Sequence, residues 1–332
     1  MKKKTIHLFL RKGIKSSHFS IENFYLDIFK KYKNENYVFK FKYCPVISKG
    51  FFRRVYLIIW SYFNQGDINH ILGDINFICL LMKKKKTINT ILDLYSLKRL
   101  SGIKKIIFKI FWLKLPLKKS RLIITISNKI KSELVKNLNT NKKLIKVIDV
   151  SINKKFSYKK QNRNQIPNIL IIGTSLNKNL ENSIRSLKNL KCKLTIVGYI
   201  EKNYLNLLKN LNINYQNFVG ISNDKIISLY KQSDILLFAS IYEGFGIPIL
   251  EAQKSGVPVV TSNLYPMKYV AGKGAYFVNP NNIKSIENGI KYILQNKRLK
   301  KNLIKEGYKN EKRFNKDIII QKYIECYNEI TF

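Results

Sequence analysis

Short runs of β-branched and other apolar residues alternate along the chain with stretches in which apolar residues recur at helical spacing. Leu180, Ile184 and Leu187 form one such helical stripe. This alternation is typical of an α/β protein with parallel sheets. The apolar runs predict strands at 5–10, 37–43, 68–72, 87–92, 122–126 and 144–148, then at 169–172, 194–197, 235–238 and 257–260.

A polar stretch without periodicity, residues 154–167, interrupts the pattern and predicts a linker. We therefore expect two consecutive α/β domains, residues 1–160 and 161–332, each long enough to bury a core. A final helix at about 316–330 is long enough to lie back across the first domain. Ser127, before a helical stripe, is expected to be an N-cap.

Composition excludes several classes of protein. The longest uninterrupted apolar runs, 55–60 and 77–82, are far too short to span a bilayer, and the mean hydropathy is −0.19. The N-terminal region lacks the pattern of a secretory signal. Four scattered cysteines without a CxxC pair indicate a reducing compartment, so we expect a cytoplasmic protein.

The net charge of +42 has two interpretations. A basic chain attracts polyanions such as nucleic acid or an anionic membrane surface. Alternatively, lysine, asparagine and isoleucine are abundant throughout, and the charge reflects this compositional bias. No nucleic-acid-binding module is recognisable in the sequence, so we do not expect a nucleic-acid partner.

Several common catalytic patterns are absent from the sequence. There is no GxxxxGK[ST] loop, no GxGxxG after a strand, no GxSxG elbow and no Asp-x-Asp pair. The three histidines are not at metal-ligand spacing. The sequence therefore predicts no resident metal and neither a P-loop enzyme nor a serine hydrolase.

The segment 242–256, YEGFGIPILEAQKSG, directly follows a predicted strand and is expected to form a loop, a helix and a second loop. Pro248 suits the first helical position, and Gly256 suits the residue that follows the helix. Gly244 and Gly246 permit close backbone approach to a ligand, and the start of a helix favours phosphate.

Glu243 and Glu251 lie before and within this helix. A carboxylate accepts hydrogen bonds from two vicinal hydroxyls, such as those of a ribose or a hexose. The segment therefore predicts a phosphate site between two acceptors for sugar hydroxyls. The alternative is a glycine-rich turn in which Glu243 is simply solvated.

EGFGIPILEA, with the following SGVPVVTSN, resembles the donor-site motif of glycosyltransferase family 4, including its Glu-x7-Glu pair at Glu243 and Glu251. GTSLNKNLENSI resembles the family segment that carries a phosphate-binding lysine, here Lys178. The resemblance is specific after about Gly173 and diffuse before it. It implies an α/β GT-B fold, with two Rossmann-like domains facing each other across a cleft, and metal-independent, retaining transfer of a sugar from a nucleotide sugar.

The resemblance also implies residue roles. Glu251 would accept the donor's ribose hydroxyls, and Glu243 would act beside the transferred sugar as a catalytic residue. The remaining donor-binding residues would hold the diphosphate, the loop through its backbone N–H groups and the lysine through its charge: Lys178, Gly244, Phe245, Gly246 and Ile247.

Two further catalytic candidates lie in the first half. Relatives often end the strand before Asp93 with a histidine, where this chain has Leu92, so Asp93 and His70 are the candidates to replace it. Both have structural alternatives, because a strand-end aspartate often caps the next turn and a lone histidine is often part of a core.

Segments 51–63 and 103–121 mix aromatic residues with lysine and arginine. Such stretches lie at membrane interfaces beside anionic lipid, or else pack within an α/β domain under lysine stems.

We expect a hexosyltransferase of cell-surface polysaccharide or lipopolysaccharide synthesis, acting on a glycan or lipid-linked acceptor and peripheral at the inner face of the cytoplasmic membrane. No cofactor beyond the nucleotide sugar is expected. The alternative is a non-catalytic nucleotide-sugar-binding protein with a transferase-like fold.

Overall fold

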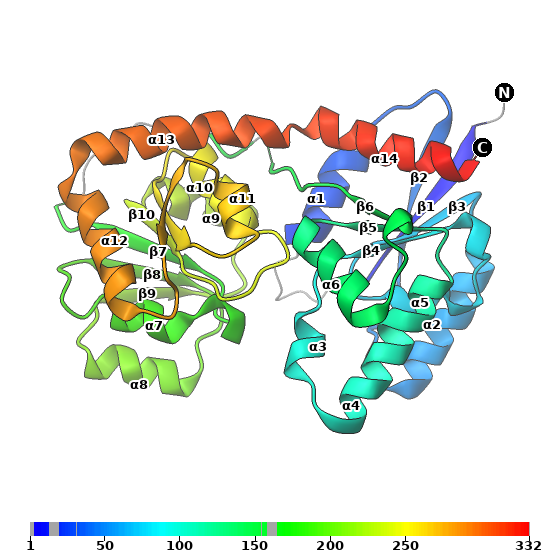
Figure 1. The fold of residues 1–332 in the computed structure, drawn as a ribbon, viewed down its shortest axis with the longest axis horizontal. Coiled ribbons are helices and arrows are strands. Elements are labelled where there is room, and N and C mark those ends of the chain that lie inside the picture. Colours follow the sequence, from blue (N-terminus) through cyan, green and yellow to red (C-terminus); the bar gives the residue numbers. More distant parts are fainter. Residues whose placement is uncertain (1–2, 13–19, 31, 154, 158–164, 332) are drawn as a thin grey trace. The chain divides into compact units, whose positions relative to one another are not determined.

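The computed structural model describes residues 3–12, 20–30, 32–153, 155–157 and 165–331. The chain divides into two compact units. Unit 1 comprises Met1–Ser151 with Lys316–Phe332, and unit 2 comprises Ile152–Asn315. Each unit has one parallel six-stranded sheet with helices packed on it (Figure 1). Most of the predicted linker, including residues 154 and 158–164, lies outside the described residues.

The sheet of unit 1 has the strand order β2-β1-β3-β4-β5-β6. All six strands lie where the apolar runs predicted them: β1 (Lys4–Leu10), β2 (Tyr37–Tyr43), β3 (Ile68–Ile71), β4 (Thr87–Ile91), β5 (Leu122–Thr125) and β6 (Ile145–Val147). Central strands β3, β4 and β5 are buried along their whole length, as expected for strands covered on both faces.

Helices of unit 1 connect these strands and cover the sheet. The larger ones are α1 (Ser20–Phe29), α2 (Phe51–Phe63), α3 (Tyr95–Arg99), α4 (Gly102–Ile107), the π-helical η3 (Phe108–Lys114), α5 (Leu115–Lys118), α6 (Asn128–Leu138) and α14 (Lys316–Thr331). The 3₁₀ helices are η1 (Asn76–Leu81), η2 (Lys84–Lys86) and η4 (Lys142–Leu144). The Ser127 hydroxyl accepts a hydrogen bond from the N–H of Ile130, which confirms the predicted N-cap of α6.

The final helix, α14, packs on unit 1 although it follows unit 2 in the sequence. Its Tyr323 and Tyr327 are fully buried, and the Tyr37 hydroxyl donates a 2.6 Å hydrogen bond to the side-chain oxygen of Asn328. The helix spans the range expected for it, about 316–330. Aromatic burial of this size contributes several kcal/mol, which explains why the chain returns to unit 1.

The sheet of unit 2 has the order β12-β11-β10-β7-β8-β9. Its strands are β7 (Asn168–Ile172), β8 (Lys193–Val197), β9 (Tyr215–Phe218), β10 (Ile235–Phe238), β11 (Val259–Ser262) and β12 (Ala275–Val278). Its helices are η5 (Leu176–Lys178), α7 (Leu180–Arg185), α8 (Lys202–Asn210), α9 (Asn223–Lys231), α10 (Ile247–Lys254), α11 (Met267–Ala271), α12 (Ile283–Gln295), α13 (Lys297–Glu311) and η6 (Lys312–Phe314).

The apolar pattern missed two strands, β9 and β12, and both are edge strands. β9 has the sequence YQNF and is largely exposed, so it lacks the apolar run of a buried strand. β11 begins at Val259, two residues later than predicted. β12 has the apolar sequence AYFV and is buried at both ends, so exposure does not account for the missed strand.

No helix in the described part of the chain is long and apolar enough to cross a membrane.

Candidate active site

The first component of the site is the loop that joins β10 to α10. Gly246 has φ +114° and serves as the N-cap of α10, a conformation that side chains rarely adopt. Pro248 is the second residue of the helix, one position later than predicted. Gly256 follows the helix with φ +72°, as the sequence predicted. The Phe245 side chain is buried against Phe314, with ring centroids 5.6 Å apart, and this contact anchors the loop.

The backbone N–H groups of Phe245, Gly246 and Ile247 lie at the start of α10. No described residue accepts a hydrogen bond from them. The first N–H groups of any helix lack an acceptor within the helix, and together with the helix dipole they attract an anion. The loop therefore presents an anion-binding set of donors.

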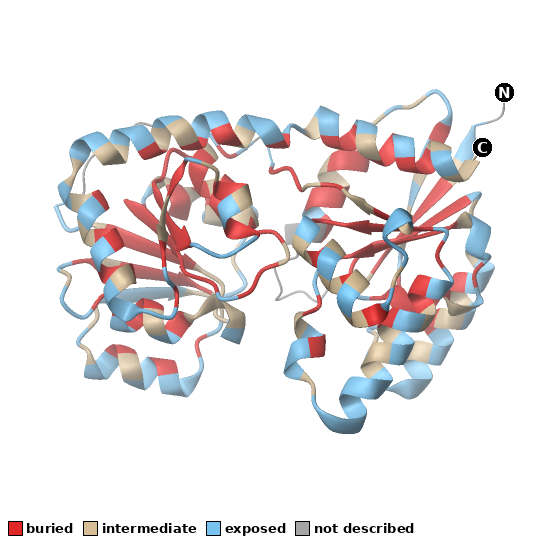
Figure 2. Ribbon diagram, in the orientation of Figure 1, coloured by how far each residue is buried: buried red, intermediate tan, exposed pale blue. Residues whose placement is uncertain are grey.

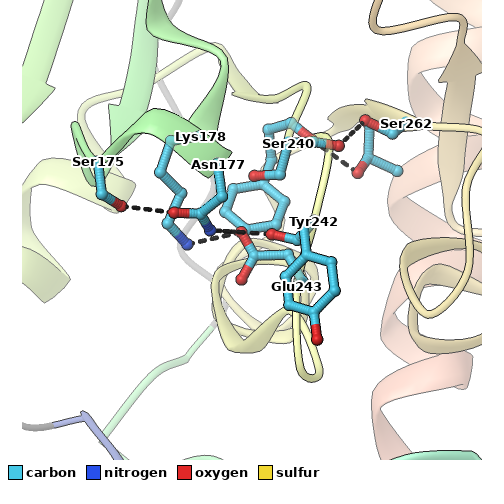
Figure 3. A network of polar contacts seen from close by, with 9 residues as sticks. Ser175, Asn177, Lys178, Ser240, Tyr242, Glu243 and Ser262 are labelled. Atoms are coloured by element: carbon cyan, nitrogen blue, oxygen red, sulfur yellow. Dashed lines mark hydrogen bonds and ion pairs between the residues drawn. The ribbon is translucent and has the colours of Figure 1, made fainter. Parts of the chain in front are cut away.

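The second component is the loop after β7, the strand adjacent to β10 in the sheet. Lys178 Nζ lies 2.7 Å from Glu243 Oε1, and both side chains are largely buried, with 19% and 11% of their surface exposed. The side-chain amide of Asn177 donates a 2.9 Å hydrogen bond to the carbonyl of Tyr242. Figure 3 shows these contacts, which join the two loops at the carboxyl ends of their strands.

Gly173, at the end of β7, gives Lys178 its position. This glycine has φ +88°, and a Cβ atom there would lie 2.9 Å from Lys178 Cε. The lysine stem therefore crosses the space that any other side chain at this position would occupy. Lys178 Nζ also lies 4.8 Å from the centroid of the Phe238 ring, which further holds the cation in place.

The third component is Glu251, on the second turn of α10. Its Oε2 accepts a 2.8 Å hydrogen bond from the hydroxyl of Tyr230, a fully buried side chain of α9. Burial raises the pKa of Glu251 to about 7, against the smaller lowering effects of the Tyr230 hydrogen bond and the charge of Lys178. Glu251 is therefore a carboxyl group that changes its charge near neutral pH.

Together, these groups make one polar site in unit 2. It combines three N–H donors, a cation and two carboxylates at the carboxyl end of a parallel sheet, where α/β proteins bind their ligands. Sequence reasoning missed Asn177 and Tyr230. Tyr230 lies on the buried side of α9, and a buried tyrosine hydroxyl needs a hydrogen-bond partner. This requirement is the sequence signal that could have identified Tyr230.

His70, in unit 1, lies in the surroundings expected for its structural alternative. The side chain is fully buried, with Nδ1 2.8 Å from the Tyr327 hydroxyl and Nε2 2.7 Å from the Thr90 hydroxyl. Burial lowers the pKa of His70 to about 3, so the ring is neutral at physiological pH. Because both ring nitrogens are engaged and no surface is exposed, His70 is a structural residue of the core. This environment argues against the catalytic role that we expected for it.

Asp93 lies on an exposed loop after β4, and its Oδ1 accepts a 2.8 Å hydrogen bond from the N–H of Tyr95 at the start of α3. This is the capping contact that was the structural alternative for this residue. Leu92, beside it, is only partly buried. No ionisable group occupies the position where relatives often have histidine.

Within the described residues, no group of three or more His, Cys, Asp and Glu side chains is placed to hold a metal ion.

Comparison with known families gives a match over residues 153–310 to the family described as "Glycosyl transferases group 1". Residues 153–310 are therefore similar to this family. The matched residues include every component of the site in unit 2.

Among curated proteins, the chain is 32% identical over 206 residues to the O-antigen chain mannosyltransferase RfbU of Salmonella typhimurium, covering 59% of this chain and 57% of that protein. It is 27% identical over 205 residues to the N,N'-diacetylbacillosaminyl-diphospho-undecaprenol alpha-1,3-N-acetylgalactosaminyltransferase of Campylobacter jejuni, covering 59% and 54%. The chain thus matches little more than half the length of these relatives.

Among solved structures, HepE of Anabaena in complex with UDP-glucose superposes with a TM-score of 0.79 at 13% identity, covering 98% of this chain and 100% of that one. At this identity the similarity establishes the fold and nothing finer. The chain therefore has the GT-B fold, as the resemblance implied.

Proposed function

We propose that this protein is a retaining, metal-independent hexosyltransferase of glycosyltransferase family 4. It transfers a sugar from a nucleotide sugar to a glycan or lipid-linked acceptor in cell-surface polysaccharide synthesis. The observation that carries the proposal is the convergence of Lys178, Glu243 and the N–H groups at the start of α10. A cation and unpaired N–H donors beside a carboxylate suit a ligand that joins phosphate to a sugar.

In this proposal the donor diphosphate binds at the start of α10, held by the N–H groups of Phe245, Gly246 and Ile247, with Gly244 giving the backbone close access. Lys178 reaches the same phosphates. An ammonium group has three N–H bonds, so Lys178 can keep its contact with Glu243 while it binds phosphate. The carboxylate of Glu251 accepts the ribose hydroxyls, and Tyr230 holds that carboxylate in place.

The chemistry follows from charge. As the bond to the leaving phosphate breaks, negative charge grows on the phosphate oxygens, and Lys178 with the helix N–H groups stabilises that charge. In this proposal Glu243, held by its ion pair with Lys178, faces the sugar attached to the diphosphate, and a carboxylate there stabilises an oxocarbenium-like transition state. These donors supply charge stabilisation that other transferases draw from a divalent metal.

Two observations support the setting of the reaction. The two relatives are named for an O-antigen chain and for a diphospho-undecaprenol-linked sugar, which are polysaccharide and lipid-linked acceptors. All four cysteines are free and buried in the structure, as suits a protein of the reducing cytoplasm. We therefore propose a cytoplasmic enzyme.

The test is incubation of the protein with a panel of nucleotide sugars, followed by detection of released nucleotide and by NMR of the anomeric proton in the product. We expect turnover of at least one donor with retained configuration and without added metal. Glu251→Ala should weaken donor binding by about ten- to a hundredfold, because hydrogen bonds to a charged group are lost. Inverted product, or activity only with metal, contradicts the proposal.

The second candidate function is a nucleotide-sugar-binding protein without turnover. Leu92 favours it, because leucine can neither donate nor accept a hydrogen bond where relatives often have histidine, and the nearby His70 is enclosed in the core. In that case the panel should show thermal stabilisation by one nucleotide sugar and no released nucleotide.

A further inference from the structure

Helix α2 of unit 1 has an unusual outer side. Leu57 and Ser61 are buried on its inner side, whereas the residues opposite them are exposed to solvent although all are apolar or aromatic. Surface helices normally place polar residues there. The exposed stripe consists of Phe52 (85% exposed), Val55, Tyr56, Ile59 and Phe63.

The helical segment formed by α4 and η3 has the same property. Leu113 is buried on its inner side. Its exposed apolar residues recur at intervals of three and four, which places them on one side of the helix: Ile103, Ile106, Ile107, Ile110 and Phe111. Ile103 and Ile106 are 76% and 58% exposed. An apolar side this long is not explained by packing within the described structure.

The two helical segments are neighbours in unit 1. The guanidinium of Arg54, on α2, lies 4.4 Å from the centroid of the Trp112 ring, on η3. Trp112 in turn contacts Phe77 of η1, against which α2 also packs. The two stripes therefore lie on adjacent helices, and we call them together the apolar face; Figure 2 shows much of α2 and α4 as exposed.

Only cations accompany the apolar face. Arg53 and Arg54 lie on α2, and Lys104, Lys105 and Lys109 lie on α4 and η3. No aspartate or glutamate occurs in residues 36–66 or 94–132. A second copy of this chain would bring the same cations together, so the charge favours a partner that is both apolar and anionic.

We propose that the apolar face inserts into the interfacial region of a lipid bilayer that contains anionic lipid. Exposed aromatic and aliphatic residues gain free energy by leaving water, and the flanking lysines and arginines gain it from anionic headgroups. The inference goes beyond the proposed function. Binding to lipid is measured without any sugar donor, and its failure is therefore distinguishable from a failure of the transfer reaction.

The test must separate this face from the general charge of the chain, since a protein of net charge +42 adsorbs to any anionic surface. The double variant Phe52→Ser with Ile106→Ser leaves the charge unchanged. Its matched control, Tyr199→Ser with Ile318→Ser, replaces side chains of comparable exposure, 71% and 53%, on other surfaces. The measurement is co-sedimentation with vesicles of phosphatidylcholine and phosphatidylglycerol in equal parts. We expect the face variant to bind at least about tenfold more weakly and the control to bind as the parent.

Insertion is tested by a tryptophan reporter at the most exposed position. Phe52→Trp should be quenched by vesicles whose acyl chains carry bromine, whereas Tyr199→Trp, on unit 2, should not be. Adsorption by charge alone would leave both reporters unquenched and would overturn the proposal.

The contribution of charge is tested separately. Lys104→Glu with Lys105→Glu should weaken binding to the mixed vesicles more than about twentyfold, and Lys188→Glu with Lys191→Glu, on unit 2, should weaken it far less. Equal binding of the parent to pure phosphatidylcholine vesicles contradicts the anionic preference.

If sedimentation shows instead that the parent dimerises and the Phe52→Ser, Ile106→Ser variant does not, the face is an interface between copies, and the membrane proposal is wrong. Circular dichroism confirms that each variant is folded.

Discussion

The two units have the same architecture, a parallel six-stranded sheet, yet they use their polar side chains in opposite ways. In unit 2, Lys178, Glu243 and Glu251 lie at the carboxyl ends of the strands. The N–H groups beside them donate no hydrogen bond to any described residue. In unit 1, His70 is enclosed among hydroxyl groups, and the outer helices expose apolar residues. Both sheets place polar side chains on or beside their strands. The difference shows that the hydrogen bonds and ion pairs among these side chains decide which polar groups can still bind a ligand.

The largest expected effect concerns Lys178. Lys178→Ala should lower turnover by about a hundred- to a thousandfold, with a smaller effect on donor affinity, because leaving-group charge is greatest in the transition state. The control is Lys254→Ala, which removes a lysine from an equally buried ion pair with Glu311, 2.8 Å away on the same unit. Steady-state kinetics with the confirmed donor provide the measurement. Equal turnover in the two variants would remove Lys178 from the site.

Replacement of His70 should lower stability and leave turnover unchanged, the reverse of the effect expected for Lys178. His70→Ala removes the partner of the Tyr327 hydroxyl and one of the partners of the Thr90 hydroxyl, and it opens a cavity, so the free energy of unfolding should fall by about 2–4 kcal/mol. Turnover per folded molecule should stay near the parental value. Urea denaturation and kinetics at low temperature measure the two quantities. A large loss of turnover at unchanged stability would restore a catalytic role for His70. The two units would then both contribute side chains to the reaction.

Asp93 is the remaining catalytic candidate of unit 1, and its test separates charge from capping. Asp93→Asn keeps an oxygen that can accept the hydrogen bond from the N–H of Tyr95 but removes the negative charge. If the carboxylate acts in the reaction, turnover should fall more than about tenfold, or 1.4 kcal/mol, with unchanged thermal stability. Leu92→His should be tolerated. Parental turnover for Asp93→Asn would leave Asp93 as a cap alone.

The smallest expected effect is a pH dependence. Sugar hydroxyls donate to the ionised form of Glu251, whose pKa is raised to about 7, so donor affinity should rise about tenfold from pH 6 to pH 8. In the unfolded chain Glu251 has its ordinary pKa of 4.5 and therefore loses its proton at a lower pH than in the folded protein. The contribution of Glu251 to the free energy of unfolding therefore falls as the pH rises from 4.5 towards 7. Calorimetric titration with a nucleotide sugar measures the affinity. Glu251→Gln is the control, and its affinity should not change with pH.

Much of the fold was predictable because it depends on local patterns. The central strands carry continuous apolar runs, since both faces of a parallel sheet are covered, and these strands were predicted correctly. Edge strand β9 was missed because it is largely exposed and lacks an apolar run. The apolar strand β12 was missed although its residues are buried or half-buried. The Ser127 cap and the turn at Gly256 were predictable because both depend on residues a few positions apart.

The sequence by itself determined the α/β architecture and the loop–helix segment around Glu243 and Glu251, since periodicity, glycines and caps act over a few residues. Tertiary structure alone decided the pairings between distant residues. Lys178 and Glu243 are 65 residues apart, and His70 and Tyr327 are 257 apart. It also decided that the apolar stripe of α2 lies on the surface rather than in the core. The physical reason is that burial and hydrogen bonding depend on which elements pack together, and no short window of sequence contains both partners.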